Sequence, residues 1–228
     1  MTANYKIVSI EGNIGAGKTT LFDEFKKKHA DNPYYIFIKE PIDEWTMKIK
    51  DQNNCSILQK FYINQEAYSF PFQITALTSR LSVLRTVINT VSKNPENQYT
   101  IFTERSLQTD KKVFATMLRD QGKMEDICYQ IYLNLFNEFA QQYTTNRTIY
   151  VKTDAKICYD RIHKRARIGE VLIPLTYLMD CDKYHEYFLG DLTSEQMLTL
   201  DGNIDIYENA DVLQKWIDEI NVFLNREN

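Results

Sequence analysis

Near the N-terminus, glycine, lysine and threonine are spaced as in a phosphate-binding loop. Residues 12–19 fit the pattern G-x-x-x-x-G-K-[ST], with a predicted strand before them and a predicted helix after them. Glycines let backbone N–H groups turn toward an anion, and the N-terminus of the following helix adds partial positive charge. Lys18 can reach the outer phosphates of a nucleotide, and the Thr19 hydroxyl can bind Mg²⁺. Motif and context together predict phosphate binding in preference to a chance glycine-rich turn.

Two carboxylates directly follow later predicted strands. Glu40 comes after the strand predicted at 34–39, where a carboxylate can accept a proton from an attacking hydroxyl. The alternative for Glu40 is a capping or surface glutamate. Glu104 and Arg105 follow the strand predicted at 99–103. Glu104 can hold Mg²⁺, and Arg105 can steady a second carboxylate or a reacting phosphate. The alternative for this pair is a structural salt bridge.

A basic cluster marks the end of another predicted helix. It contains Arg161, Lys164, Arg165 and Arg167, and Gly169 follows it. Arg161 and Arg165 are four residues apart and therefore share a helical face. Such a cluster is usually a solvated face that complements the helix C-terminus. Beside a phosphate-binding loop it also predicts a lid, in which guanidinium groups clamp the γ-phosphate and the glycine supplies flexibility.

The elements that must position these residues alternate between strand and helix. Apolar, β-branched runs predict five strands, at 5–10, 34–39, 99–103, 148–152 and 196–200. Repeated β-α units predict a parallel sheet covered on both faces, with its active site at the carboxyl ends of the strands. Helices are predicted at 18–29, 56–68, 72–92, 109–119, 125–141, 154–165, 174–188 and 210–224. We therefore expect a three-layer α/β fold in one domain over 1–228.

The composition excludes several classes of protein. The formal net charge of −4 argues against a nucleic-acid-binding surface, so positive charge must be concentrated locally. No apolar stretch is long enough to span a bilayer, and no signal peptide is recognised at the N-terminus. The four cysteines are far apart, which argues against a disulfide framework or zinc site and favours a reducing compartment. We expect a cytoplasmic protein with no membrane or nucleic-acid partner.

Several motifs in a fixed order make the sequence resemble the deoxynucleoside kinase family, which includes deoxycytidine kinase and deoxyguanosine kinase. The resemblance spans nearly the whole chain and implies a P-loop NTPase fold with a five-stranded parallel sheet and an arginine-rich lid at about 161–170. It rests on IEGNIGAGKT at 10–19, Glu40-Pro41 with Trp45, SFPFQ at 69–73, ERS at 104–106, RIHKRAR at 161–167, and IPL at 173–175 with Tyr177-Leu178.

The resemblance implies roles in the transfer step. Glu40 matches the general base that takes the proton from the 5′-hydroxyl, and Arg105 matches the arginine that supports it. Lys18 and the lid arginines Arg161, Arg165 and Arg167 complete the catalytic set. Thr19 and Glu104 match the metal site for Mg²⁺. The residues expected to bind the ATP or other NTP donor are Gly12, Asn13, Ile14, Gly15, Ala16, Gly17, Lys18, Thr19, Thr20, Arg161, Arg165, Asp205 and Ile206.

The resemblance also implies an acceptor site for a small-molecule deoxynucleoside. Tyr62 and Glu170 match the pair that holds the sugar 3′-hydroxyl. Gln73 matches the residue that reads the base, and its carboxamide can pair with the ring nitrogen and amino group of cytosine or adenine. The further residues expected around the nucleoside are Ile14, Trp45, Phe72, Arg80, Arg105, Asp110 and Phe114. Independently of the family, Gln73, Ala76 and Arg80 share one helical face.

Arg80 and Asp110 sharpen the expected substrate choice. They match an Arg-Asp pair of the deoxycytidine and deoxyguanosine members, whereas thymidine-accepting members have smaller or apolar residues there. We therefore expect transfer of the ATP γ-phosphate to deoxycytidine, purine deoxynucleosides or both. The alternative for the pair is a salt bridge that only holds two helices together.

Two other functions remain open at the level of the sequence. One is a nucleoside monophosphate kinase of the thymidylate kinase type, which shares the phosphate loop, the Glu-Pro motif and a lid. The other is a non-catalytic nucleotide-binding switch. The resemblance also implies a homodimer through helices in the 56–68 and 125–141 regions, although the same apolar residues can belong to the core.

Overall fold

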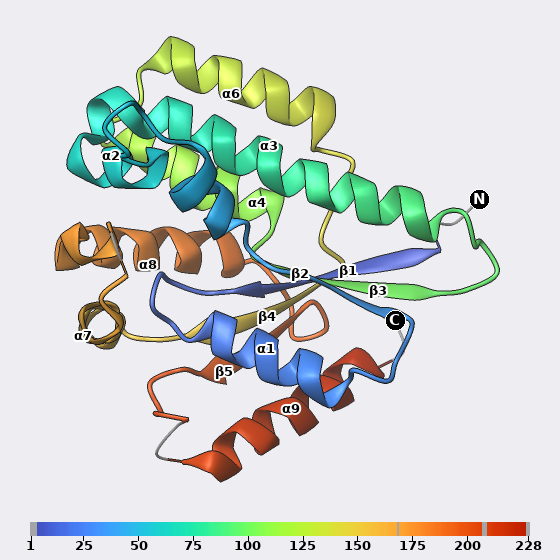
Figure 1. The fold of residues 1–228 in the computed structure, drawn as a ribbon. Coiled ribbons are helices and arrows are strands. Elements are labelled where there is room, and N and C mark those ends of the chain that lie inside the picture. The colour runs from blue at the N-terminus through green and yellow to red at the C-terminus, as the bar shows by residue number, and fades with distance from the viewer. Residues whose placement is uncertain (1–3, 168, 207–208, 227–228) are drawn as a thin grey trace.

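Five parallel strands form one sheet in the order β2-β3-β1-β4-β5 (Figure 1). This computed structural model describes residues 4–167, 169–206 and 209–226. The strands are β1 (Tyr5–Glu11), β2 (Tyr35–Ile38), β3 (Tyr99–Glu104), β4 (Arg147–Lys152) and β5 (Met197–Asp201). The expected α/β fold of the P-loop NTPase type, with a five-stranded parallel sheet, is confirmed.

The central position of β1 determines where the site can form. β1 pairs with β3 on one side and β4 on the other, with Ile10 opposite Glu104 and Glu11 opposite Tyr150. Both faces of such a strand are covered, which explains its nearly continuous apolar sequence. β1 and β3 are parallel neighbours. The loop that follows β1 and the end of β3 at Glu104 therefore lie next to each other at the same edge of the sheet.

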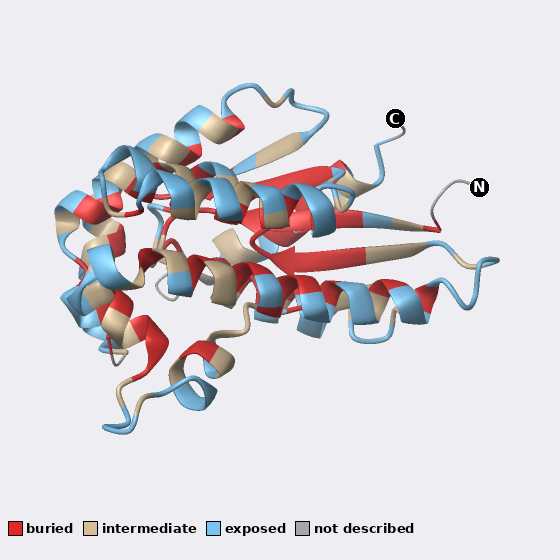
Figure 2. Cartoon of the chain, turned by 90° about the horizontal axis from the view of Figure 1, so that it is seen from above, coloured by how far each residue is buried: buried red, intermediate tan, exposed pale blue. Residues whose placement is uncertain are grey.

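Helices cover both faces of the sheet. Figure 1 shows α1 (Lys18–Lys28) and α9 (Ala210–Leu224) on one face. On the other face lie α2 (Ile57–Ile63), α3 (Gln65–Val91), α6 (Asp126–Phe139) and α8 (Leu175–Leu189), with α7 (Ala155–Arg165) beside α8. Figure 2 shows buried residues along the strands and the inward sides of the helices, as expected for one continuous core.

The boundary between α2 and α3 corrects one prediction. The sequence predicted helices at 56–68 and 72–92, with a break before Phe72, whereas the break lies at Asn64 and α3 runs through Pro71. The Asn64 side chain accepts a hydrogen bond from the Ala67 N–H and caps the new helix. A proline inside a helix costs about 3 kcal/mol or more. Burial of one side of the 27-residue α3 against the core offsets that cost.

The segment after β3 is helical but irregular. The helix predicted at 109–119 consists of α4 (Leu107–Thr109), the π-helical turn η2 (Asp110–Ala115) and α5 (Thr116–Asp120). A second π-helical turn, η1 (Glu44–Lys48), follows β2, and a 3₁₀ turn, η3 (Glu170–Leu172), follows α7. π-helical turns often occur at functional sites, and both of these carry predicted site residues.

The structure bears only in part on two expectations about where the protein is located. Within residues 4–167, 169–206 and 209–226, no helix combines the length and apolarity required to cross a bilayer. All four cysteines have free thiols, with Cys158 and Cys181 buried. The cytoplasmic location and the reducing compartment remain predictions of the sequence.

Candidate active site

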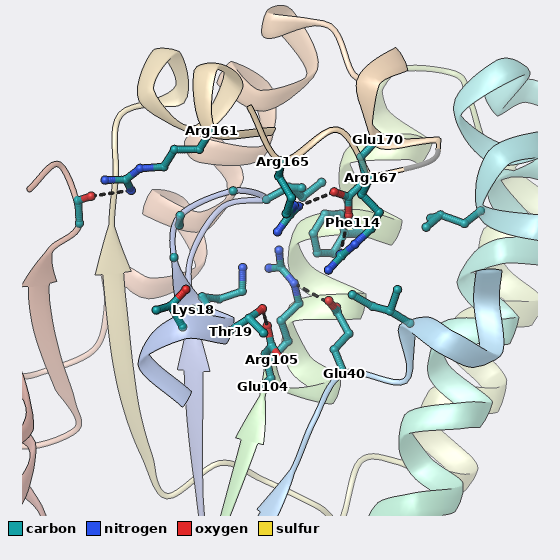
Figure 3. A pocket seen from close by; sticks show the side chains of 18 of the residues that line it. Lys18, Thr19, Glu40, Glu104, Arg105, Phe114, Arg161, Arg165, Arg167 and Glu170 are labelled. Carbon is teal, nitrogen blue, oxygen red and sulfur yellow. Dashed lines mark hydrogen bonds and ion pairs between the residues drawn. The ribbon is translucent and has the colours of Figure 1, made fainter. Parts of the chain in front are cut away.

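One cavity of about 540 Å³ opens at the carboxyl ends of the strands and gathers nearly all predicted site residues (Figure 3). Of those residues, only Gly12 and Asn13 do not line it. The predicted residues that line it are Ile14, Gly15, Ala16, Gly17, Lys18, Thr19, Thr20, Glu40, Trp45, Tyr62, Phe72, Gln73, Arg80, Glu104, Arg105, Asp110, Phe114, Arg161, Arg165, Arg167, Glu170, Asp205 and Ile206.

Two features of the phosphate loop, its backbone conformation and its lack of space, both require glycine at Gly12 and at Gly15. Both have positive φ, +146° and +83°, which side-chain-bearing residues rarely adopt. Both also leave no room for a Cβ, which would lie 2.6 Å from the Val151 carbonyl oxygen at Gly12 and 2.6 Å from the Cys158 carbonyl oxygen at Gly15. The close packing of the loop on β4 and α7 therefore fixes its path toward the cavity.

Lys18 is the buried cation of this loop. Its Nζ donates a hydrogen bond to the Asn13 carbonyl oxygen at 2.7 Å. Burial, and next the neighbouring Arg105, lower the pKa of Lys18 to about 8, although Glu40 and Glu104 act in the opposite direction. Gly17 precedes α1 without a side-chain cap, so the first N–H groups of this helix are oriented for an anion.

Thr19 and Glu104 meet directly, since the Thr19 hydroxyl donates a hydrogen bond to the Glu104 carboxylate. Hydroxyl and carboxylate oxygens are the hard ligands that Mg²⁺ prefers. Among the described residues, no group of three or more His, Cys, Asp or Glu side chains is placed to hold a metal. The pair fits a Mg²⁺ ion that takes few protein ligands and shares the phosphates of a nucleotide, which is the usual mode for this ion.

Glu40 lies among three cations and is 14% exposed to solvent. Arg80 forms an ion pair with it, and the Arg105 Nε is 3.4 Å from its Oε1. Burial raises the pKa of the Glu40 carboxyl, but Arg80, Arg105 and Lys18 together hold that pKa below its usual value. Glu40 is therefore ionised at neutral pH and can accept a proton.

Arg105 is held from several sides. Its φ of +66° is unusual for a residue with a side chain. Its Nη1 donates a hydrogen bond to the Gly12 carbonyl oxygen at 2.8 Å and lies 3.2 Å from the Nε2 of His185. The guanidinium also lies over the Phe114 ring, 4.9 Å from its centroid.

The far end of the cavity combines aromatic walls with a polar row on α3. Gln73, Ala76 and Arg80 all line it, as their shared helical face predicted. Gln73 is buried, and its Oε1 accepts no hydrogen bond from the described part of the chain. Arg80 pairs with Asp110 through its Nε at 3.1 Å and donates from Nη1 to the Glu104 carbonyl oxygen at 2.9 Å. The Arg-Asp pair therefore both joins two elements and lines the cavity.

The arginines of the predicted lid have two different sets of partners. Arg165 and Arg167 both pair with the buried carboxylate of Glu170, as the dashed lines in Figure 3 show. Arg161 points the other way and donates to the carbonyl oxygens of Gly202 and Ile204, at 2.8 and 3.3 Å. Arg161 and Arg165 share a helix but not a partner. Ile168, inside the predicted lid, lies outside the described residues.

Tyr62 lines the cavity near Glu170. Burial, and next the nearby Glu170 carboxylate, raise the pKa of its hydroxyl well above the usual value. The hydroxyl therefore stays protonated. Gly169 precedes Glu170 with a φ of +91°, and a Cβ there would lie 3.1 Å from the Gln59 side chain. The positive φ therefore favours glycine directly before η3.

Comparison with known proteins bears directly on this geometry. A family model described as deoxynucleoside kinase matches residues 8–225. The chain belongs to the deoxynucleoside kinase family. It is 32% identical over 216 residues to a probable deoxycytidine kinase of fowlpox virus (strain NVSL), covering 90% of this chain and 83% of the relative. It is 31% identical over 242 residues to deoxycytidine kinase 2 of Gallus gallus, covering 95% and 89%.

A solved structure gives the same result for the fold of this deoxynucleoside kinase. It is the deoxyadenosine kinase of M. mycoides with the products dCMP and a flexible dCDP bound. The two chains are 25% identical with a TM-score of 0.74, and the match covers 96% of this chain and 98% of the other. The resemblance inferred from the motifs is confirmed, and the enzyme is a kinase that binds small nucleosides and nucleotides.

Sequence reasoning missed several residues of this deoxynucleoside kinase site. Phe61 and Tyr177 line the cavity beside Tyr62; Phe61 gave no signal distinct from the core, and Tyr177 entered only as part of a motif, with no role assigned. His185 does not line the cavity, yet it contacts Arg105 from α8, 80 positions along the chain. A single histidine in a helix carries no motif, so only the folded chain could reveal it.

Proposed function

We propose that the protein transfers the γ-phosphoryl group of ATP to the 5′-hydroxyl of deoxycytidine, of purine deoxynucleosides, or of both. The observation that carries this proposal is the placement of Gln73. A carboxamide offers one acceptor and two donors, and a buried carboxamide oxygen without a partner among the described residues is costly. A base that presents an amino group beside a ring nitrogen satisfies it. Cytosine and adenine both do so.

The proposed reaction is an in-line transfer that asks little covalent chemistry of the protein. Glu40 accepts the proton of the 5′-hydroxyl as that oxygen attacks the γ-phosphorus, and the bond to the β-γ bridging oxygen breaks. Arg105 keeps Glu40 ionised and lies beside the attacking oxygen. Lys18, Arg165 and Arg167 offset the negative charge carried by the phosphoryl oxygens. Glu170 and Tyr62 hold the 3′-hydroxyl, which fixes the direction of the 5′-hydroxyl.

Thr19 and Glu104 are the residues proposed to hold Mg²⁺, which supplies charge neutralisation on the phosphates when bound. The loop after β5, with Asp205 and Ile206, is proposed to lie against the donor base. The two hydrogen bonds from Arg161 to Gly202 and Ile204 support this assignment, because they tie the loop to the helix that carries the lid.

Arg80 and Asp110 are proposed to set the base preference. Both side chains line the cavity together with Gln73, and we propose that they occupy the space that a thymine methyl group would need. Relatives named deoxycytidine kinase and a structural neighbour named deoxyadenosine kinase with dCMP bound are consistent with a pocket for amino-bearing bases. We expect thymidine to be a poor acceptor.

A homodimer through α6 is also proposed. Ile127, Ile131 and Phe139 are 65%, 43% and 48% exposed although they are large and apolar. They lie four and eight residues apart, so they form one stripe along the outer side of α6. Burial of this stripe against a second copy would remove it from water. Light scattering on the wild type and on Ile131→Asp tests the dimer, since a charge in the stripe should yield monomers.

The function is tested by steady-state kinetics with ATP and Mg²⁺ on the four deoxynucleosides and on thymidine monophosphate. The expected result is turnover of deoxycytidine, a purine deoxynucleoside or both, with thymidine and thymidine monophosphate far behind. Efficient phosphorylation of thymidine alone would refute the base preference. Phosphorylation of the monophosphate alone would replace the proposal by a nucleoside monophosphate kinase activity, and nucleotide hydrolysis without any acceptor would favour a switch.

A further inference from the structure

We propose that His185 is a positioning residue that holds the Arg105 guanidinium in the orientation needed by Glu40. The proposal rests on the proposed roles of Arg105 and Glu40, and it concerns a side chain outside the cavity. His185 is fully buried in α8, 80 positions from Arg105 in the chain. It does not line the cavity itself but contacts two residues that do, Arg105 and Phe114, and we assign its effect to Arg105.

The hydrogen bonds of His185 fix its tautomer. Its Nδ1 lies 2.7 Å from the Cys181 carbonyl oxygen, which can only accept, so the ring proton must be on Nδ1. Nε2 then carries a lone pair. This lone pair lies 3.2 Å from Nη1 of Arg105, which can only donate. Each partner therefore permits one arrangement, and the neutral ring accepts a hydrogen bond from the guanidinium.

The two acceptors around Nη1 determine which edge of the guanidinium faces the cavity. Nη1 carries two hydrogens, and the Gly12 carbonyl oxygen at 2.8 Å and the His185 Nε2 account for both. Nη1 therefore has no hydrogen left to donate to Glu40. The Nε edge remains for Glu40, whose Oε1 lies 3.4 Å from Nε. Without the histidine, Nη1 would keep one acceptor and the guanidinium could rotate about it.

The surroundings of His185 keep it neutral. Burial, and next the charges of Arg105 and Lys18, lower its pKa to about 3. The Tyr150 ring stacks on it with centroids 6.5 Å apart, and Phe114 meets it edge-on. Charged groups on the elements packed around it include Glu11, buried at the end of β1 next to Tyr150, and Glu186, which bonds Tyr150 and Lys152. Asp182 and Lys183 of α8 and Asp110 and Lys112 of η2 are also on these elements. A protonated ring would lose the lone pair and repel the guanidinium.

The same helix also holds the phosphate loop. Asn13 donates from Nδ2 to the Leu178 carbonyl oxygen at 2.8 Å. Leu178 and His185 are seven residues apart and so lie on one face of α8. One rigid helix thus fixes the loop that binds the donor and the arginine that supports the base. Their relative position is set by α8 as well as by the sheet.

Two variants separate positioning from packing. His185→Gln keeps an acceptor oxygen at nearly the reach of Nε2, whereas His185→Met fills a similar volume without a strong acceptor. The measurements are kcat and both KM values, the pH profile of kcat, and thermal unfolding. A histidine that only fills space would change unfolding in both variants without moving the pH profile.

The expected result for His185→Met is a kcat lower by about 10- to 100-fold, because small misplacements of catalytic groups have effects of that size. Its KM values should change little. The acidic limb of its pH profile should move upward by roughly 0.5 to 1 unit, since loosening a cation forfeits part of the 1–3 unit effect of an ion pair. The cations facing Glu40 are Arg80, Arg105 and Lys18, and only Arg105 is disturbed. His185→Gln should recover most of kcat.

A spectroscopic arm gives a readout that does not depend on activity. In ¹⁵N-histidine NMR of the wild type, His185 should show the neutral Nδ1–H form throughout pH 5 to 8. A ring that titrates in this interval, or the Nε2–H form, would overturn the proposal. So would equal loss of kcat in both variants with an unmoved acidic limb, or wild-type kcat in both. If the wild type phosphorylated no deoxynucleoside, the proposed function and this inference would fall together; the other outcomes remove the inference alone.

Discussion

Thr19 at the start of α1 donates a hydrogen bond to Glu104 at the end of β3, although 85 positions separate the two residues in the chain. The contact joins the phosphate loop to the neighbouring strand end. It follows from the register of the sheet, in which Glu104 lies opposite Ile10 just before the loop begins. Two oxygen ligands of the kind that Mg²⁺ prefers are therefore adjacent without any sequence proximity.

Replacing Glu104 by glutamine should raise the Mg²⁺ concentration needed for half-maximal activity about 10-fold or more, because perturbing metal-site partners typically costs 10–100-fold in affinity. The measurement is a Mg²⁺ titration at saturating ATP and deoxynucleoside. Thr19→Ser is the matched control, since it keeps the hydroxyl and should change the titration little. An unchanged Mg²⁺ requirement in Glu104→Gln would remove Glu104 from the metal site.

Replacing Glu40 by glutamine should lower kcat by about 10²- to 10⁴-fold, the usual contribution of a positioned base. The amide keeps the shape of the carboxylate but cannot take the proton. Asp43→Asn is the control, because it neutralises an exposed carboxylate three residues away that does not line the cavity. Steady-state kinetics and circular dichroism check both variants. Turnover near the wild-type level in Glu40→Gln would end its assignment as the base.

The low pKa of Lys18 predicts an alkaline limb in the pH profile of kcat/KM for ATP. The charged ammonium binds phosphate, and burial lowers its pKa to about 8, so binding should weaken as the pH rises through that value. In Lys18→Arg the guanidinium stays protonated, and the limb should disappear at a lower overall rate. A limb of the same position in Lys18→Arg would assign it to another group.

Substituting Gly15 by alanine should impair the phosphate loop far more than the same change at Gly122. Both glycines have positive φ, +83° and +67°, which costs an alanine roughly 1–2 kcal/mol. At Gly15 the new Cβ would also meet the Cys158 carbonyl oxygen at 2.6 Å, whereas nothing lies within 4 Å at Gly122. Denaturant unfolding and ATP binding should therefore both weaken in Gly15→Ala. Equal effects on unfolding would show that the loop moves away from α7.

His185 should make the protein sensitive to mild acid. Its pKa is about 3 in the folded chain, against about 6.5 for an unfolded histidine, so the unfolded state binds a proton first as the pH falls. The contribution of His185 to the free energy of unfolding is fully present above pH 6.5. It declines below that pH by about 1.4 kcal/mol per pH unit. Between pH 6.5 and 5, His185→Gln should lose less unfolding free energy than the wild type. Parallel pH dependences would indicate that His185 titrates normally.

Local spacing predicted the parts of the site that are continuous in the chain. Residues 12–17 link β1 to α1, Glu40 lies two residues after the end of β2, and Glu104 ends β3, close to where the spacing predicted them; their roles stay predictions. The prediction of the helix break near Phe72 was wrong, because a local rule about Pro71 competes with the burial of a long helix. Arg161 and Arg165 share a helical face, yet only the folded chain shows that they bind different partners.

The sequence by itself determined that the chain is a deoxynucleoside kinase with a phosphate loop, because those signals lie in short runs of residues whose spacing dictates their geometry. The tertiary structure decided how charges are shared in the cavity. Arg80 between Glu40 and Asp110, and His185 behind Arg105, are contacts across 30 to 80 positions. Their distances depend on how helices pack on the sheet, and no local pattern encodes that packing. The Thr19–Glu104 contact depends on sequence and on tertiary structure. The motifs predict the two residue types, and the register of the strands brings the side chains together.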